Sequence, residues 1–422
     1  QRCPTEAIRV REGCAAISPQ KCIDCGECIR VCPYKAKKAT HDRLDSLKNY
    51  KYKIALPAPA LYGQFDNLDD IDFVVQGLYD MGFDDVFEVA KAAEMVSGYT
   101  RQYLRSENIP KPVISSACPV IVRLISMRFP LLCKNILPIL PPVEVAGKFA
   151  REKALSEHPE LSDSDIGCFF ISPCPAKVSY VKNSFSGTKS NVDGVLSVSD
   201  VYFELVSAMN KIKVPEKSTE AGCVGVSWAT AGGESTAVFN ERYLAADGIE
   251  NVIRVLDQIE NSDFPELEFV ELNACNGGCV GGVMTVANPY IAKARIHSLR
   301  RYLPVSPNYH PSDGEMDGGV VMPDVESIPQ TPLSDDRAEA VRMMSDIQEI
   351  RKDLPDLDCG SCGAPTCAAF AEDIVRGEAS ADDCVVFMRH VFHDYIKRHV
   401  QQSRIAEEKT ADGENERRKA DT

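Results

Sequence analysis

Short apolar runs alternate with amphipathic stretches through the middle of the chain. The runs with the composition of short buried strands are KIALPAPAL (53–61), PVISSA (112–117), IGCFFIS (166–172) and LEFVELNA (267–274). Stretches around them place apolar residues at helical spacing, over 69–81, 91–106, 199–211 and 287–302. Strands that alternate with helices predict an α/β domain, and two groups of such units predict two lobes.

Composition divides the chain into five segments. Residues 1–48 are rich in Cys and Pro and have few apolar residues, so we expect them to fold around a metal. Residues 49–305 hold most of the apolar runs, and 306–334 have the Pro, Gly and Asp of a surface linker. Residues 335–400 have a helical pattern around a second group of cysteines. The last segment, 401–422, is nearly all polar or charged, and we expect this tail to fray.

The net charge and the absence of long apolar runs exclude several classes of protein. The chain of 422 residues has 47 Lys and Arg against 62 Asp and Glu, a net charge of −15, which repels nucleic-acid phosphates. No apolar run approaches the ~18 residues that span a bilayer, and no secretory signal is visible. We therefore expect a cytoplasmic protein that binds neither nucleic acid nor membrane. Because the first residue is Gln, we also expect the natural chain to begin upstream.

Cysteine is the most informative residue type. The chain has 17 cysteines, and many of them fall at short, regular spacings. In a chain of this length, such spacing indicates metal binding in a reducing compartment rather than disulfides. Thiolates suit both iron–sulfur clusters and zinc, so the spacing has to decide between them. Cys14, Cys133, Cys168 and Cys223 lie outside any such spacing and are interpreted as ordinary small residues.

The first cysteine motif lies near the N-terminus. Its spacing, Cys22-x2-Cys25-x2-Cys28-x3-Cys32 followed by Pro, is that of the bacterial ferredoxin run. In that pattern three cysteines hold one [4Fe–4S] cluster and the fourth serves another. Cys3, also followed by Pro, completes the first ligand set, and the cluster served by Cys32 needs ligands upstream of Gln1. Zinc is the alternative, although zinc sites rarely use this run.

The second cysteine motif lies near the C-terminus. Cys359-x2-Cys362-x4-Cys367 is followed, after x16, by Cys384. The glycines and the proline within it allow a tight loop around a metal, and a helix is predicted to begin after the loop. The motif resembles the four-cysteine [4Fe–4S] domain of several electron-transfer and sensory proteins. A zinc site is again the alternative, but a zinc ribbon usually has two CxxC pairs.

The cysteines of the middle region lie at the ends of predicted strands. Cys118 follows VISSA, Cys174 follows FFISP, and Cys275 and Cys279 follow VELNA. Strand ends in an α/β fold converge on one crevice, so four cysteines from three strands can meet at one cluster. The glycines of the run NACNGGCVGG let the backbone pass close to a bulky inorganic group.

The loops SSACP, SPCPAK and LNACNGGCVGG resemble the three signature loops of the [FeFe] hydrogenases. The resemblance covers about residues 1–305 and includes the ferredoxin module in the expected order. It implies a two-lobed α/β H-cluster domain with an N-terminal α+β ferredoxin-like module, to which the C-terminal motif adds a small helical iron–sulfur domain. It also implies that the [4Fe–4S] part of the H-cluster is held by Cys118, Cys174, Cys275 and Cys279.

The resemblance further implies a two-iron subsite of the H-cluster. In the family this subsite has CO and cyanide ligands and a bridging dithiolate amine, and Cys279 would bridge it to the cubane. Lys177, three residues after Cys174, matches the lysine that hydrogen-bonds one cyanide, a reasonable role for an ammonium beside an anion. The chain would then hold at least three [4Fe–4S] clusters, including that of the H-cluster, and Cys32 would contribute to a fourth with upstream residues.

The first loop departs from the family where the proton path begins. The family has two adjacent cysteines before proline, and Ala117 stands where the first of them belongs. That cysteine relays protons between the cluster's amine and the protein, whereas a methyl group has no proton to exchange. Other departures lie in the second and third loops and in the helix before the first loop, where paired glutamates are usual: Ser172, Tyr180, Asn273, Val96 and Ser97, with Glu94 nearby.

Three functions are open at this point. The first is a sensory [FeFe] hydrogenase that interconverts H2 with protons and electrons slowly, because losing a positioned acid–base group costs ~10²–10⁴-fold in rate. The second is a metabolic hydrogenase linked to ferredoxin, which high turnover would favour. The third is a non-catalytic iron–sulfur scaffold or assembly factor without the two-iron subsite. Expected partners are ferredoxin or a downstream signalling protein, maturation proteins that install the subsite, and a second copy in a homodimer.

Overall fold

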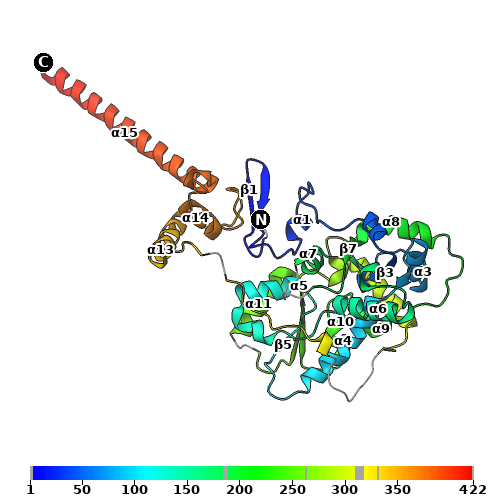
Figure 1. Ribbon diagram of the computed structural model, residues 1–422. Coiled ribbons are helices and arrows are strands. Elements are labelled where there is room, and N and C mark those ends of the chain that lie inside the picture. Colours follow the sequence, from blue (N-terminus) through cyan, green and yellow to red (C-terminus); the bar gives the residue numbers. More distant parts are fainter. Residues whose placement is uncertain (1–2, 184–188, 262–263, 309–317, 330–331, 421–422) are drawn as a thin grey trace. The chain divides into compact units, whose positions relative to one another are not determined.

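The computed structural model describes residues 3–183, 189–261, 264–308, 318–329 and 332–420, with side chains up to residue 402 (Figure 1). These residues form two compact units, which are described separately. Residues 23–330 make up the larger one, the core unit, and residues 1–22 together with 331–422 make up the terminal unit. The five predicted segments stay predictions, because these two units are bounded differently.

A four-stranded parallel sheet is the first of two sheets in the core unit. Its strands are β3 (Tyr52–Pro57), β4 (Asp85–Val86), β6 (Ile166–Ser172) and β7 (Gly194–Ser197), in the order β4-β3-β6-β7. Every residue of β6 is buried, as in a strand that is covered on both faces. Alternate residues serve different cores, since Cys168 and Phe170 join one hydrophobic cluster while Phe169 and Ile171 join another.

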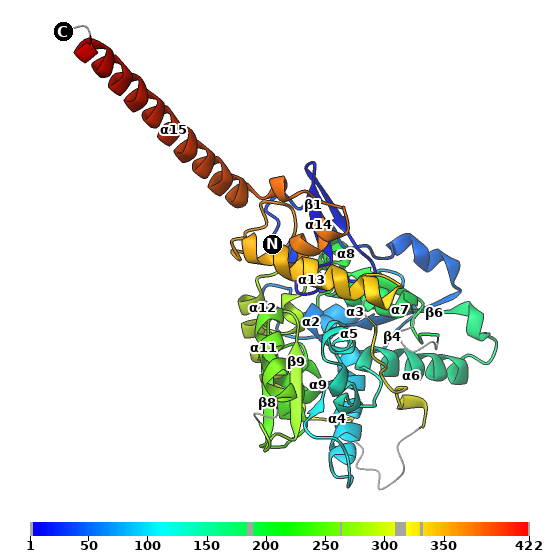
Figure 2. The same ribbon diagram turned by 90° about the vertical axis from the view of Figure 1, so that its left-hand side faces the viewer.

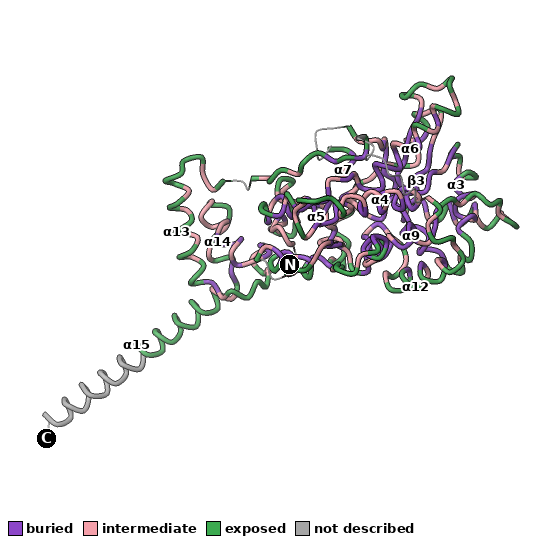
Figure 3. Tube along the Cα trace, turned by 90° about the horizontal axis from the view of Figure 1, so that it is seen from below, coloured by how far each residue is buried: buried purple, intermediate pink, exposed green. Residues whose placement is uncertain are grey.

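Helices cover both faces of this sheet. On one face, α4 (Val89–Leu104) and α6 (Pro142–Glu157) pack with Cys168 and Phe170. On the other face, α3 (Asp72–Asp80) and α8 (Val198–Met209) pack with Phe169 and Ile171. Figure 3 shows the buried residues concentrated along β3 and α4. Removing these apolar side chains from water, at roughly 25 cal/mol per Å², is the main term that stabilises the unit.

A three-stranded parallel sheet forms the second lobe. The order is β5-β9-β8, with β5 (Val113–Ile114), β9 (Phe269–Asn273) and β8 (Tyr243–Asp247), and β8 and β9 run side by side in Figure 2. Val270 and Leu272 of β9 pack with α5 (Pro119–Arg128) and α11 (Ile249–Glu260). The two parallel sheets confirm the predicted two-lobed α/β fold.

Proline begins a helix directly after two of the strand-end cysteines. Cys118 is the N-cap residue of α5, which starts at Pro119, and Cys174 precedes α7 (Pro175–Asn183). Proline is favoured at the first helical position because its φ is already helical and its missing N–H would have no partner there. The sequence Cys-Pro therefore ends a strand-to-helix turn and holds each cysteine at the start of a helix.

The terminal unit combines a hairpin with helices from the other end of the chain. The hairpin pairs β1 (Ile8–Arg11) with β2 (Cys14–Ile17) in antiparallel register. The helices are α13 (Arg337–Asp353), α14 (Cys367–Val375) and α15 (Val385–Ala420). Leu354, Phe370 and Cys367 are buried in one small core. A core of this size leaves much of the stability to other interactions, which fits a module built around a metal.

Several expectations are confirmed and others are revised. The strand predicted over 166–172 is β6, and those predicted over 112–117 and 267–274 contain β5 and β9. The strand predicted over 53–61 is wrong in its second half: β3 ends at Pro57, and Pro59 begins the helix α2 (Pro59–Tyr62). Residues 401–420, which were expected to fray, belong to α15. Part of the predicted linker 306–334 packs on the core unit, where Val320 and Met322 are buried and the Leu140 amide donates to the carbonyl oxygen of Val320.

Candidate metal centre

One cavity of the core unit gathers the cysteines that follow the strands. It lies where β6, β9 and the segment after β5 end, as the convergence of parallel strand ends requires. Its lining includes all four cysteines of the three signature loops, which are Cys118, Cys174, Cys275 and Cys279. The structure therefore brings together four side chains that are up to 161 positions apart in the sequence, counting from Cys118 to Cys279.

The surroundings of three of these thiols disfavour their thiolate forms. Desolvation raises the pKa of the Cys174 thiol well above its ordinary value and that of Cys279 to about 12, and the neighbouring thiolates add to both shifts. Desolvation raises the pKa of Cys275 as well. Crowded thiols that resist ionisation become thiolates when a cationic centre compensates their charge. The donor set therefore fits an iron–sulfur group.

Glycines bring the third loop close to its neighbours. Gly278 has φ of +90°, and a Cβ there would lie 2.4 Å from the backbone nitrogen of Ala231. A Cβ on Gly282 would lie 2.1 Å from the carbonyl oxygen of Pro173, in the second loop. Any larger residue at either position would force these segments apart. The glycines predicted to allow close approach thus serve the packing of loop against loop around the cavity.

Lys177 lies on the wall of the same cavity. It stands in the first turn of α7, three residues after Cys174. Its amine donates a hydrogen bond of 2.9 Å to the carbonyl oxygen of Ala117, and it lies 5.6 Å from the centre of the Tyr180 ring. Burial lowers the pKa of Lys177, while the thiolates of Cys118 and Cys174 oppose that shift. An ammonium held here faces the group that the cysteines would bind.

Two buried glutamates line the cavity and were missed by the sequence analysis. Glu234 lies in α10 (Gly233–Ala237), where one carboxylate oxygen accepts a 2.7 Å hydrogen bond from Ser115 Oγ. The other oxygen, Oε1, is buried without a hydrogen-bond partner among the described residues. Burial and the charge of Glu271 raise the pKa of Glu234 well above its ordinary value. Burial beside the candidate metal centre thus favours the neutral form of Glu234.

Glu271 supports this arrangement from β9. Its carboxylate accepts hydrogen bonds from the amides of Gly232 (2.9 Å) and Ser235 (2.8 Å) and from Asn273 Nδ2 (2.8 Å). Burial raises the pKa of Glu271, and these donors oppose the shift. The sequence contains one clue to the pair, since Glu271 stands between Val270 and Leu272 in the predicted buried strand LEFVELNA. A carboxylate inside a buried strand needs partners or a function.

In the family, the helix before the first loop has paired glutamates. In this chain that helix is α4, whose residues near those positions make structural contacts. Ser97 donates to the Ala93 carbonyl at 2.8 Å and accepts from Trp228 Nε1 at 3.1 Å. Glu94 is buried and accepts from the Gly222 amide at 2.7 Å and from Asn308 Nδ2 at 2.9 Å. These contacts hold loops to α4. Glu94 is not among the residues that line the cavity.

The N-terminal motif is divided between the two units. Cys3 and Cys22 belong to the terminal unit, and Cys25, Cys28 and Cys32 belong to the core unit. The first ligand set therefore stays a prediction from its spacing. Cys32 accepts a 3.4 Å hydrogen bond from the Ala36 amide, and such backbone donors lower its pKa. A thiolate at Cys32 is thus favoured, as a metal ligand requires.

The C-terminal motif lies within the terminal unit. Cys367 and Cys384 are buried in its small core, and Cys362 packs against them. Burial raises the pKa of Cys362, and the charges of Cys384 and Cys359 add to the shift. The Cys367 amide donates to Asp358 Oδ1 at 2.7 Å and so fixes the loop between the first three cysteines. These members of the motif therefore face one another around a common site.

Among the described residues, no group of three His, Cys, Asp or Glu is arranged to hold a single metal ion. The choice between an iron–sulfur cluster and zinc at the N-terminal and C-terminal motifs rests on the spacing of their cysteines.

Comparison with protein families identifies the class. The family "Iron only hydrogenase large subunit, C-terminal domain" matches residues 51–240 and 204–283, which together exceed half of the chain. The chain belongs to this family. A 4Fe-4S binding domain matches residues 15–38, and an Fe-S cluster family matches residues 354–386. The chain is therefore an [FeFe] hydrogenase-like protein with two further iron–sulfur motifs.

Individual relatives are distant. The chain is 24% identical over 309 residues to Iron hydrogenase 1 of Clostridium pasteurianum, which covers 58% of this chain and 52% of that protein. It is 56% identical over 36 residues to the corrinoid/iron-sulfur protein large subunit of Moorella thermoacetica, 8% of each chain. The chain thus spans about half of the first of these curated relatives and a small part of the second.

Solved structures share the fold. A structure of [FeFe]-hydrogenase HydA1 from Chlamydomonas reinhardtii superposes with a TM-score of 0.51 at 15% sequence identity, covering 66% of this chain and 94% of that chain. Another structure of the same protein gives a TM-score of 0.50 at 15% identity over the same shares. Within the described residues, no helix is both long and apolar enough to cross a membrane.

Proposed function

We propose that this chain is an [FeFe] hydrogenase of the sensory type, which interconverts H2 with protons and electrons slowly. One observation supports this proposal above the others. The cavity that gathers four cysteines and Lys177 is lined by Ala117 at the position of the family's relay cysteine. The residues that would hold the cluster are kept, while the residue that would pass its proton is replaced. Such a site can bind H2 and change its redox state without fast turnover.

Named residues would hold the cofactor. Cys118, Cys174, Cys275 and Cys279 would hold the cubane, and Cys279 would also bridge to the two-iron subsite. Lys177 would donate a hydrogen bond to one cyanide, as an ammonium does to an anionic acceptor. When bound, this group supplies the metal site at which H2 is split or formed. The four cysteines that line the cavity and the glycine-rich third loop fit a bulky inorganic group.

The chain offers a different proton holder at the same cavity. Glu234 Oε1 is buried without a partner among the described residues, and its pKa is raised by burial. Its other oxygen is tied to Ser115, whose Oγ also accepts from the Ala117 amide at 3.1 Å. Glu234 is thus fixed relative to the first loop. In its neutral form this carboxyl can donate a proton into the cavity. It would do so from α10, and not from the first loop, where the family has its relay cysteine.

Electrons would enter and leave through the flanking motifs. Cys3, Cys22, Cys25 and Cys28 would hold one [4Fe–4S] cluster, and Cys359, Cys362, Cys367 and Cys384 another. Cys32 would contribute to a fourth cluster. A ferredoxin or a downstream signalling protein would exchange electrons with this chain, and dedicated maturation proteins would install the two-iron subsite. We place the protein in the cytoplasm and include a homodimer among its expected states.

A turnover assay distinguishes this function from its nearest alternative. The similarity to Iron hydrogenase 1 of Clostridium pasteurianum favours a metabolic hydrogenase as the second candidate. With reduced ferredoxin as donor, we expect H2 evolution ~10²–10⁴-fold below that of a metabolic hydrogenase matured in parallel. Turnover equal to that of the metabolic enzyme would overturn the sensory assignment and support the alternative.

A further inference from the structure

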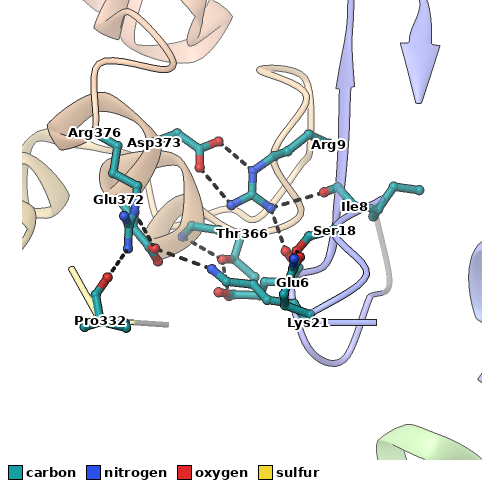
Figure 4. A network of polar contacts seen from close by, with 12 residues as sticks. Glu6, Ile8, Arg9, Ser18, Lys21, Pro332, Thr366, Glu372, Asp373 and Arg376 are labelled. Carbon is teal, nitrogen blue, oxygen red and sulfur yellow. Dashed lines mark hydrogen bonds and ion pairs between the residues drawn. The ribbon is translucent and has the colours of Figure 1, made fainter. Parts of the chain in front are cut away.

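The two ends of the chain meet in one polar interface inside the terminal unit. Asp373 of α14 binds two arginines of β1, Arg9 and Arg11. Figure 4 shows its contact with Arg9. Arg9 donates from Nε at 2.6 Å and from Nη2 at 2.8 Å, one bond to each carboxylate oxygen. Arg11 donates from Nη2 at 2.7 Å, and the side chain of Asp373 is only 3% exposed. A buried carboxylate held by a two-pronged guanidinium has strict geometry.

Further contacts join the loops that carry the cysteines. The Val10 amide donates to the Gly363 carbonyl oxygen at 2.8 Å, and a Cβ on Gly363 would lie 1.9 Å from the Val10 oxygen. Thr366 Oγ1, which also caps α14, donates to Glu6 Oε1 at 2.5 Å. Gly363 follows Cys362 directly, and Thr366 directly precedes Cys367. The interface therefore bears on the cluster loop itself rather than on remote parts of the module.

The N-terminal side of the interface is equally close to ligand positions. Lys21 directly precedes Cys22, and its amine lies 3.4 Å from Glu372 Oε1. Glu6 lies three residues after Cys3, and its amide donates to the Cys3 carbonyl oxygen at 3.3 Å. Residues adjacent to both predicted ligand sets thus contact each other across the interface.

We propose that this interface fixes the C-terminal iron–sulfur module on the N-terminal hairpin, so that an electron passes directly between the clusters of the two motifs. In that step one cluster is oxidised and the other is reduced. The inference rests on the proposed function, because it assumes that both motifs hold clusters. The C-terminal cluster is then a fixed branch of the electron path, and Asp373 is the residue that holds the C-terminal module on the hairpin.

The test uses the full chain, reconstituted anaerobically, with Asp373→Asn as the main variant and Thr366→Val as a milder one. Lys21→Gln is the matched control, because its pair is longer and partly exposed. Hydrogen exchange at the Val10 amide reports the interface without depending on iron. Electron paramagnetic resonance of the fully reduced chain reports the magnetic interaction between clusters.

In the unmodified chain we expect a protected Val10 amide and spin coupling between two reduced clusters. Asp373→Asn should exchange at Val10 at least about tenfold faster and lose the coupling at unchanged iron content, and Lys21→Gln should do neither. If Asp373→Asn does not fold, Thr366→Val should show the same changes to a smaller extent. Unchanged exchange and coupling in both variants would overturn the docking. An unmodified chain without iron in the C-terminal motif would instead overturn the proposed function.

A second inference concerns Arg30, in the core unit. This residue ends the short helix α1 (Glu27–Arg30) and lies two positions after Cys28. Its Nη1 lies 2.5 Å from Glu27 Oε2, and its Nη2 donates to the Gly281 carbonyl oxygen at 3.0 Å. The charges of the guanidinium and of the Cys275 thiolate attract each other: they raise the pKa of Arg30 and oppose the rise in the pKa of Cys275. Arg30 therefore connects the ferredoxin motif to both ends of the third signature loop.

Packing holds this contact in place. A Cβ on Gly26 would lie 2.6 Å from Val283 Cγ2, so the turn before α1 lies directly against the segment after the third loop. Ile23 is 2% exposed and belongs to the core of the second lobe. Glu27, on the same helical turn, orients the guanidinium. The contacts with Glu27 and with the Gly281 carbonyl hold the charge of Arg30 at one position.

We infer that Arg30 is a positioning residue that raises the reduction potential of the cubane held by Cys275. Reduction adds negative charge to the cluster and its thiolates, and a nearby cation or N–H donor stabilises that charge. Because Arg30 stands on α1, the helix that contains Cys28, it also lies on the electron path between the two predicted clusters. This inference too rests on the proposed function.

Redox titration of the cubane in the reconstituted full chain tests the inference. Arg30→Gln should move its midpoint potential to more negative values, and Arg30→Lys should recover part of the difference. Glu27→Gln should move it the opposite way, because Glu27 partly compensates the charge of Arg30. Arg254→Gln, an exposed arginine of α11, is the control and should leave the potential unchanged.

Three results contradict this role of Arg30. They are an unchanged potential in Arg30→Gln at full iron content, shifts of the same sign in Arg30→Gln and Glu27→Gln, and a shift in Arg254→Gln as large as that in Arg30→Gln. If Arg30→Gln loses its iron, the sign of the Glu27→Gln shift decides. Absence of any cubane signal in the unmodified chain would instead overturn the proposed function.

Discussion

The amine of Lys177 lies 2.9 Å from the carbonyl oxygen of Ala117. Both residues were selected from the sequence, one because it matches the family and the other because it departs from it. The lysine uses the backbone of residue 117 and not its side chain. A substitution at Ala117 can therefore restore a proton-relay group while the lysine contact stays in place, which makes this position suitable for a direct test.

Ala117→Cys should raise H2 evolution by about one to three orders of magnitude, if the outer proton path is otherwise complete. A thiol can pass a proton by hydrogen bond, whereas a methyl group cannot. The measurement is H2 evolution of the matured chain with a reduced dye, compared at equal H-cluster content.

Ser116→Cys provides the control for a new thiol. Ser116 Oγ donates to the Ile139 carbonyl oxygen at 2.6 Å and does not line the cavity, so a cysteine there should leave the rate unchanged. A rise of only a few-fold in Ala117→Cys would place the limit further out along the path. An unchanged rate with a native infrared spectrum would show that the relay argument is wrong.

Glu234→Gln should lower H2 evolution by about two orders of magnitude or more, because the amide cannot release a proton as a carboxyl does. Glu88→Gln is the matched control. Glu88 is also buried and accepts from the Tyr62 hydroxyl at 2.8 Å, but it does not line the cavity. Equal losses in both variants would indicate a general effect of removing a buried carboxylate.

The pH dependence of stability provides an independent check on Glu234. Its pKa is raised in the folded state by burial and by Glu271. Above its ordinary pKa the unfolded chain loses this proton while the folded chain keeps it, so folding stability falls as pH rises, by at most about 1.4 kcal/mol per pH unit for one proton. Glu234→Gln removes this term and should gain stability relative to the unmodified chain between pH 5 and 8. A difference that is constant with pH would contradict the assigned protonation.

Cys362→Ser should remove about four irons from the reconstituted chain and leave the H-cluster signals intact. The unmodified chain should hold at least about twelve irons before maturation, from three clusters. Cys14→Ser changes an exposed cysteine outside both motifs and should keep all the iron. A total of about four irons in the unmodified chain would contradict the three ligand sets, and loss of the H-cluster in Cys362→Ser would indicate a structural role for the module.

Lys177→Gln should reduce retention of the two-iron subsite while the cubane stays bound. Glutamine keeps a donor for the Ala117 carbonyl but has no charge for an anionic ligand. The cyanide bands of the matured variant, compared with iron content before maturation, measure the effect. Full bands at the native positions would show that the ammonium is dispensable.

The sequence predicts those parts of the fold that depend on local pattern. The sequence predicts the strand β6 over its whole length because IGCFFIS is a short, mostly apolar run with the length of a buried strand. The hairpin β1–β2 was not predicted: its strands are four residues long, and Asp373, which binds Arg9 and Arg11, lies more than 360 positions away. The helix after Val385 continues through a polar tail that composition alone indicated to be frayed.

In the site, too, local pattern predicts some residues, whereas others depend on long-range contacts. Four cysteines at strand ends could be placed at one cavity because parallel strands end at one edge. Glu234 could not, because a glutamate in a glycine-rich turn has no local sign of burial. Its surroundings come from Ser115, directly after β5, and from Glu271, on β9. Long-range burial, not local pattern, makes it a candidate proton holder.

The most direct test of the central claim is the infrared spectrum of the matured full chain in the CO and cyanide stretching region, recorded under argon, H2 and CO. The proposed function predicts bands of both ligand types that shift under H2 and under CO, together with slow turnover. A chain with full iron content that shows no such bands, after a maturation that loads a metabolic hydrogenase in parallel, would contradict it.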